Sequence, residues 1–296
     1  MKKIIKKFSF YQLILIVIFT FITLTMLIPL LNILAVSLSD PSVSSKMSGL
    51  EIIPKKLSLI NYKVILSNPV LVPSLLNSIF ITVVGTLINV LLTTTAAYVL
   101  TRPGLVFKKL FMVFLIFMML FDPGIVPEYL VIKDIGLMGS RWSVILVNAV
   151  NVYYLIIMMR FFNEVPKEII EAAEIDGCGH IKMLFKVIWP LSKAGIATIT
   201  MFYAVIRWNE YFKASIYIGD AKKTTLQVIL RQFIVLDDTV SILGAQNILN
   251  YNELAKLDYN ALKYATIIVA IIPILILYPL VLKYYAGDVM AGGVKE

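Results

Sequence analysis

Two stretches of this chain are too long and too free of charge to belong to a water-soluble domain. Residues 8–39 and residues 64–101 contain no charged side chain. A helix needs about 20 apolar residues to cross the hydrocarbon layer of a membrane. Within that layer the backbone must satisfy its own hydrogen bonds, and only helices and closed barrels do so. The length of these stretches predicts an all-α integral membrane protein.

Further apolar stretches bring the predicted number of transmembrane helices to six. The expected spans are residues 13–36, 74–100, 110–127, 142–160, 194–213 and 264–283, within a single domain of residues 1–296. Only 15% of the residues are charged, whereas soluble domains contain roughly 25%. The first stretch is about twice as long as the apolar core of a signal peptide, so we expect a retained helix there.

Lysine and arginine predict the orientation of these spans. Residues 2–7 contain four lysines, and the short segment 101–109 is net positive. Short segments of this kind stay in the cytoplasm. With six spans, both termini and the segment between the fourth and fifth spans are then cytoplasmic. We interpret the net charge of +9 as this bias, with membrane lipid as the surroundings and no nucleic acid as a partner.

Two charges interrupt the third and fifth predicted spans at a similar depth. Asp122 lies 13 residues after Lys109, and Arg207 lies 14 residues after Lys193. At 1.5 Å per residue this is roughly 20 Å into a layer of about 30 Å. Charges at that depth usually pair or line a wet cavity. In one hypothesis both residues lie at the outer end of a translocation path and could pair; in the other the helices end early, at the lipid headgroups.

The segment between the fourth and fifth spans, residues 163–193, has the pattern of a soluble helix-turn-helix. Pro166 suits the first turn of a helix, and acidic residues recur on every third position near that end, where negative charge is favoured. Gly177 predicts the turn. A second helix is expected over residues 180–188, ending near Pro190 because proline cannot continue the hydrogen-bond ladder.

The acidic first helix of this segment predicts a protein partner. Helices that lie on membranes usually carry lysine and arginine on their polar face, whereas this one carries Glu168, Glu171 and Glu174. Ala172 and Ala173 are small enough to let another surface approach closely. An amphipathic helix on the membrane surface remains the alternative interpretation.

The same segment resembles the EAA loop of bacterial ABC importer permeases. That motif has EAA, three residues, glycine, nine residues and then I-x-L-P. Here Glu171-Ala172-Ala173 is followed by Gly177 and, after nine residues, by Val187-Ile-Trp-Pro190, in which valine and tryptophan replace isoleucine and leucine. Further segments along the chain, among them Phe202-Tyr-Ala-Val-Ile-Arg-Trp-Asn209, are similar to the carbohydrate branch of these permeases, in particular those for complex oligosaccharides and polysaccharide fragments.

This resemblance implies a type I ABC importer permease fold with a cytoplasmic coupling helix-turn-helix. A second homologous permease would complete the pore in the bacterial cytoplasmic membrane. Two ATPase subunits would bind the coupling loops, and an extracytoplasmic solute-binding protein would deliver the oligosaccharide. The residues that the resemblance assigns to ATPase coupling are Glu171, Ala172, Ala173, Asp176, Gly177 and Pro190.

Polar and aromatic residues of the third and fifth spans are candidates for the translocation path. Sugars stack on aromatic faces and exchange hydrogen bonds with polar side chains, and an arginine can hold a carboxylate in a two-pronged manner. Arg207 thus suggests acidic, uronate-containing sugars, whereas an aromatic belt at the membrane interface is the alternative. The candidates are Asp122, Tyr203, Arg207, Trp208, Asn209, Tyr211 and Phe212.

The chain contains no catalytic motif. No G-x-x-x-x-G-K-[ST] sequence occurs among its 14 glycines, so ATP and Mg²⁺ are expected on the partner ATPase and no cofactor on this chain. Cys178 and His180 are neighbours in the coupling segment, but two ligands do not make a structural metal site. We therefore expect a non-catalytic subunit of an ATP-driven transporter.

Two other functions remain open on the sequence. One is an ABC permease for a non-sugar solute. The other is a stand-alone secondary transporter, which would usually show repeated halves and more charge within the membrane. Neither feature is evident here.

Overall fold

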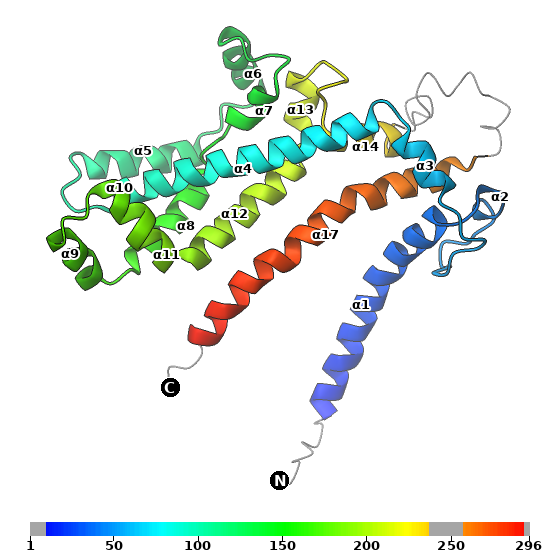
Figure 1. Ribbon diagram of the computed structural model, residues 1–296, viewed down its shortest axis with the longest axis horizontal. Coiled ribbons are helices and arrows are strands. Elements are labelled where there is room, and N and C mark those ends of the chain that lie inside the picture. The colour runs from blue at the N-terminus through cyan, green and yellow to red at the C-terminus, as the bar shows by residue number, and fades with distance from the viewer. Residues whose placement is uncertain (1–9, 237–256, 293–296) are drawn as a thin grey trace. The chain divides into compact units, whose positions relative to one another are not determined.

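The computed structural model describes residues 10–236 and 257–292 (Figure 1). Within these ranges the regular elements are helices, and the only strand-like pairing is a bridge between Ser39 and Leu57. The prediction of an all-α chain is confirmed. The chain forms two compact units, Met1–Pro69 with Gln232–Ile271, and Val70–Arg231 with Ile272–Glu296. Each unit is described by itself.

Three of the described helices are long and apolar enough to cross a membrane. They are α1 (Phe10–Ser37), α4 (Leu71–Thr101) and the first part of α17 (Tyr259–Gly292). A fourth crossing results if α5 (Lys108–Leu120) and α6 (Ile125–Asp134) count as one broken span, although they are bent by 113°. α8 (Val152–Asn163) is apolar but shorter.

The expected span 142–160 is broken into two helices. α7 (Arg141–Leu146) ends before α8 begins. Between them Asn148 adopts a left-handed conformation with φ 52°, and the side chain of Asn151 accepts a hydrogen bond from the backbone of Tyr154 at 3.2 Å. Asparagine tolerates a left-handed conformation, as at Asn148, and its side chain can cap the start of a helix, as at Asn151. A single continuous helix was therefore the wrong prediction for this segment.

The expected spans 110–127 and 194–213 also end sooner than predicted. α5 stops at Leu120, and Asp122 accepts a hydrogen bond from the backbone of Gly124 at 2.9 Å, which fixes the bend before α6. α12 (Lys193–Trp208) is followed by the separate short α13 (Phe212–Tyr217). A further helix, α14 (Leu226–Ile234), follows in the next part of the chain.

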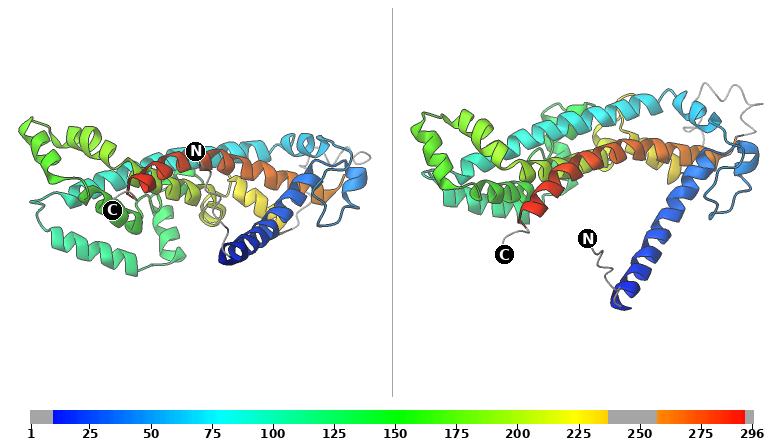
Figure 2. Two further views of the ribbon diagram at one scale, coloured as in Figure 1. Left: turned by 90° about the horizontal axis from the view of Figure 1, so that it is seen from below. Right: turned by 60° about the horizontal axis from the view of Figure 1, so that its bottom comes forward.

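The core of the larger unit is formed where α4 lies along α8 and α12 (Figures 1 and 2). Its buried apolar side chains include Tyr98, Met158, Phe162 and Ile199. Gly195 lets α12 approach α8 closely, because a Cβ atom there would lie 2.4 Å from Cγ of Phe161.

One face of α4 is polar and yet buried. Asn77 donates to the carbonyls of Lys222 and Thr224 at 2.9 and 3.0 Å, and Ser78 accepts from the backbone of Leu226 at 2.8 Å. These contacts fasten the start of α14 to α4. The buried polar residues of α4 are Ser74, Asn77, Ser78, Thr82, Thr86, Asn89, Thr93 and Thr94.

The smaller unit is held by side chains that bind backbone carbonyls. Asn61 of α3 (Ile60–Leu66) is fully buried and donates to the carbonyls of Ser37 and Ser39 at 2.9 and 3.0 Å. Asp40 caps the short α2 (Pro41–Ser44). The hydrogen bonds from Ser42 lower the pKa of Asp40, so that its carboxylate stays charged. The loop after α1 is thereby tied to that helix.

Replacing Gly195 by valine should destabilise the larger unit, whose core is formed by α4, α8 and α12. Overpacking of a tight contact costs about 1–3 kcal/mol, so we expect a lower midpoint of thermal unfolding in detergent. Gly49 is the matched control, since a Cβ atom there meets no other atom within 4 Å. Equal midpoints for Gly195→Val and Gly49→Val would contradict the close approach.

Candidate functional site

The coupling segment begins with α9 (Lys167–Ile175) and turns at Gly177. Gly177 has φ 75°, a left-handed conformation that glycine adopts without strain. Its backbone N–H donates to the carbonyl of Glu174 at 3.0 Å, and that of Cys178 donates to Ala173 at 2.9 Å. This pair of bonds is a Schellman motif, which satisfies the last carbonyls of the helix.

The second part of the segment passes through Pro190 instead of ending before it. α10 (His180–Lys182), the π-helix η1 (Met183–Ile188) and α11 (Trp189–Leu191) follow one another without interruption. In an α-helix the ring of Pro190 would clash with the carbonyl four residues earlier. The wider π turn, in which Trp189 donates to Leu184, relieves this clash. The helical run ends at Leu191, close to the predicted end near Pro190, and it extends three residues beyond the expected range of 180–188.

α9 has an inner and an outer side. Ile170 and Ala173 are half-buried and pack against the core of α4, α8 and α12. The outer side is open: Ile175 is 87% exposed and Ile181 of the next helix is 77% exposed. Of the residues predicted to act in coupling, Glu171, Ala172, Asp176, Gly177 and Pro190 are exposed.

A polar contact ties this segment to the end of α4. The hydroxyl of Tyr98 and Nδ1 of His180 are 2.9 Å apart, and the two rings meet edge to face. The guanidinium of Arg102 lies over the Tyr98 ring, 4.6 Å from its centroid. His180, which the sequence showed only as a turn residue, therefore connects the coupling segment to a long apolar helix.

Arg207 lies near the end of α12 and is buried, with 6% of its surface exposed. Its guanidinium donates to the carbonyls of Val144, Ile145 and Val147, the last two at 2.8 and 3.3 Å. It also donates to Oδ1 of Asn89 on α4 at 3.1 Å. The accepting carbonyls are at the end of α7, so Arg207 holds the break between α7 and α8.

Asp122 and Arg207 do not pair in this structure. The carboxylate of Asp122 is exposed and binds the backbone of Gly124, whereas the guanidinium of Arg207 is occupied by four acceptors on α4 and α7. The hypothesis that the two charges form an ion pair was therefore wrong. Each charge binds backbone groups where a helix ends.

The other predicted path residues divide into buried and exposed groups. The buried Tyr203 shares a hydrogen bond with Thr93 at 2.7 Å and accepts from the backbone of Asn151 at 2.9 Å. Trp208 is also buried. The exposed residues are Asn209, Tyr211 and Phe212.

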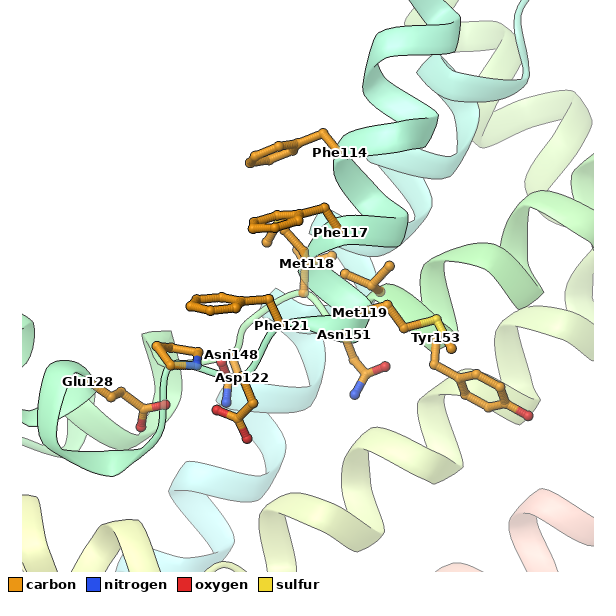
Figure 3. Close-up of a pocket in the computed structure, with 13 residues that line it drawn as sticks. Phe114, Phe117, Met118, Met119, Phe121, Asp122, Glu128, Asn148, Asn151 and Tyr153 are labelled. Atoms are coloured by element: carbon orange, nitrogen blue, oxygen red, sulfur yellow. The ribbon is translucent and has the colours of Figure 1, made fainter.

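A wide cavity of about 660 Å³ lies between the bend of α5 and the break of α7 and α8. Figure 3 shows Phe114, Phe117 and Phe121 projecting from one side of α5. Polar side chains reach the cavity from the bend between α5 and α6 and from the break between α7 and α8. The polar lining residues are Asp122, Glu128, Asn148, Asn151 and Tyr153.

A charged cluster holds α6 against α13 next to this cavity. Glu128 forms an ion pair with Lys213 at 2.8 Å and accepts a hydrogen bond from the hydroxyl of Tyr217. Burial, with the neighbouring carboxylate, raises the pKa of Tyr217 well above its usual range. The phenol therefore stays protonated and keeps donating. The carboxylate of Glu128 is fully engaged by these two partners.

Several of these residues could not be assigned from the sequence. Asn148 and Asn151 interrupt an apolar run, a pattern that could have indicated the break. Asn89 and Glu128 carry no local signal, because their partners lie far away in the chain: Asn89 and Arg207 are separated by 118 positions. Among the described residues no group of three or more histidine, cysteine, aspartate or glutamate side chains could hold a metal ion.

Comparison with known proteins identifies the family. The chain is 37% identical to a Bacillus subtilis polygalacturonan/rhamnogalacturonan transport system permease protein, YtcP, over 90% of this chain and 92% of the relative. It is 39% identical to the Bacillus subtilis protein LplC, over 91% of this chain and 89% of the relative. This chain belongs to the carbohydrate-uptake branch of ABC importer permeases. No family model matches the sequence of the permease.

The fold agrees with this assignment. A crystal structure of a bacterial ABC transporter involved in the import of the acidic polysaccharide alginate superposes on the permease with a TM-score of 0.85. The match has 29% sequence identity and covers 94% of this chain and 99% of the other. The permease is thus a membrane component of an ABC importer for oligosaccharides or polysaccharides, and the secondary-transporter alternative falls away.

Replacing Arg207 by methionine should destabilise the permease strongly. Each buried carbonyl left without a donor costs roughly 1–3 kcal/mol, and three carbonyls lose Arg207 together. We expect a clear fall in the thermal unfolding midpoint in detergent. Arg160→Met is the control, since that side chain is 83% exposed and only reaches Glu164 at 3.4 Å. A similar small change in both variants would refute the proposed hold on α7.

Proposed function

We propose that the permease forms a pore with a second, homologous permease and imports oligosaccharide fragments of acidic polysaccharides. The names of two similar proteins support the substrate class, since one refers to polygalacturonan and rhamnogalacturonan and the other to alginate. Arg207 is no longer the reason for expecting uronates, because it is buried and both of its Nη groups already donate to backbone carbonyls or to Asn89.

In this proposal the segment from α9 to α11 docks on a separate ATPase subunit, and the partner permease provides the second docking loop. The observation that carries it is the two-sided packing of α9. Its inner residues pack on the core, while Glu171, Ala172 and Ile175 stay open. An exposed surface that is both acidic and apolar suits a protein partner better than anionic lipid. ATP and Mg²⁺ bind the ATPase, and this chain binds no cofactor.

The proposal places six crossings in the bacterial cytoplasmic membrane, with both termini and the α9–α11 segment in the cytoplasm. The lysines of residues 2–7 and of the segment before α5 support this orientation. The two broken segments, α5–α6 and α7–α8, and the short α12 are then crossings that irregular backbone completes. An extracytoplasmic solute-binding protein would deliver the oligosaccharide on the side of α6 and α13.

The translocation path follows the cavity between the two breaks. Broken helices within a membrane are tolerated where they line a water-filled space or are buried in protein. Asp122 lines the cavity, so its carboxylate belongs to the path in this proposal. In this proposal three buried residues stabilise the helices around the path and do not contact the sugar. They are Tyr203, Arg207 and Trp208.

Replacing Glu171 by alanine should weaken the docking of the ATPase subunit and so reduce ATP-driven transport. In the reconstituted complex of both permeases, the ATPase and the binding protein, we expect sugar-stimulated ATPase activity and uptake to fall together by an order of magnitude or so. The physical reason is the loss of a charged contact at the docking surface. The measurement is phosphate release with and without the loaded binding protein.

Glu164→Ala is the matched control. Glu164 is also exposed and precedes α9, where its partner is Arg160 at 3.4 Å. Stimulated activity in Glu171→Ala equal to that of this control would show that Glu171 is not the critical contact. Failure of the chain to assemble with any ATPase would refute the docking role altogether.

A further inference from the structure

We infer that the cavity between α5 and α8 is a subsite for an uncharged, hydroxyl-bearing pyranose unit of the transported oligosaccharide. The inference rests on the proposed function. It adds which part of a mixed, partly acidic substrate this chain contacts, and which part it leaves to the other subunits.

The aromatic side of the cavity suits the apolar face of a sugar ring. The rings of Phe117 and Phe121 are stacked, with centroids 5.4 Å apart and planes inclined by 10°. Both side chains are 57% exposed in this chain. The face of an aromatic ring carries partial negative charge and attracts the weakly positive C–H groups of a pyranose. In Figure 3 Asp122 lies directly next to Phe121.

The polar side offers hydrogen-bonding groups with unused capacity. One carboxylate oxygen of Asp122 accepts from Gly124, and its other oxygen has no protein partner in the described part of the chain. Asn151 uses its carbonyl to cap α8, which leaves its amide N–H groups for a ligand. The side chain of Asn148 likewise has no partner among the described residues. A carboxylate accepts hydrogen bonds from the hydroxyls of a sugar, and an amide N–H donates to them.

The charge of the cavity excludes a uronate carboxylate from this position. No lysine or arginine lines it. Lys213 is paired with the lining residue Glu128 at 2.8 Å, and Arg207 is buried and does not line the cavity. A carboxylate placed beside Asp122 would meet a like charge with nothing to offset it. Acidic units must therefore be held elsewhere in the transporter.

Contact with lipid does not explain the polar groups that line this cavity. The exposed carboxylate of Asp122 lies at the bend after α5, and Asn148 and Asn151 add polar groups from the break between α7 and α8, so this surface needs polar surroundings. A sugar in water supplies such partners, whereas lipid chains do not.

The experiment uses proteoliposomes that contain the whole transporter with its binding protein. The two probes are digalacturonate, in which both units are acidic, and a galacturonosyl-rhamnose disaccharide, in which one unit is neutral. Asp122→Asn keeps the shape and most hydrogen bonds but removes the charge. We expect it to raise the uptake of digalacturonate several-fold relative to the mixed disaccharide. Phe121→Ala should raise the KM for uptake of both probes while ATPase stimulation by the binding protein persists.

Matched controls exist on the same helices. Asp134→Asn removes an exposed charge at the end of α6, and Phe111→Ala removes an exposed ring of α5; neither residue lines the cavity. An unchanged uptake ratio in Asp122→Asn, or equal effects of Phe121→Ala and Phe111→Ala, overturns the inference while leaving import intact. A wild-type transporter that imports neither probe contradicts the proposed function instead.

A second readout does not depend on turnover. In a Cys178→Ser background, Met118→Cys places a single thiol in the cavity lining. A water-soluble maleimide should label it in the complex, and the mixed disaccharide should slow the labelling more than digalacturonate does. No labelling would mean that lipid or another subunit covers the cavity, and labelling that no sugar slows would mean that no sugar binds there. Either result overturns the inference.

Discussion

Arg207 donates hydrogen bonds to the carbonyls of Val144, Ile145 and Val147 and to the side chain of Asn89. These contacts join α12, α7 and α4 at one point. A buried cation needs hydrogen-bond acceptors around it, and carbonyls freed by a helix break need donors. The arginine and the break thus satisfy each other. The break in turn places Asn148 and Asn151 at the cavity, so the proposed path depends on this one side chain.

The polar face of α4 also joins helices of the larger unit through hydrogen bonds. In lipid there is little hydrophobic force between helices, and small polar residues at close contacts hold them together. α4 shows this pattern, since Asn77, Ser78 and Thr93 all bind groups on other elements. Other apolar residues of α4 face outward. Leu76, Val83 and Leu87 are more than half exposed in the isolated chain. The helix is therefore built with its polar side inward.

The coupling segment is short and continuous with α12. From His180 to Leu191 the chain remains helical, and only Ser192 separates α11 from α12. Tyr98 and the core residues around Ile170 hold the segment against α4 and α8. A displacement of α9 by a partner would act directly on α12, which carries Arg207. The proposed docking surface and the proposed path are thus connected through few covalent and hydrogen-bonded steps.

The sequence by itself determined the features that depend on local pattern. The length of residues 8–39 and 64–101 requires membrane helices, the Glu171 motif predicts an exposed helix ending at Gly177, and Asp122-Pro123-Gly124 predicts a bend. Only the tertiary structure decided where buried polar groups meet. The partners of Arg207 are 60 or more positions away, and no local pattern specifies such distant contacts. For the same reason the sequence could not show that Tyr203, a candidate sugar contact, is buried and bonded to Thr93 and Asn151.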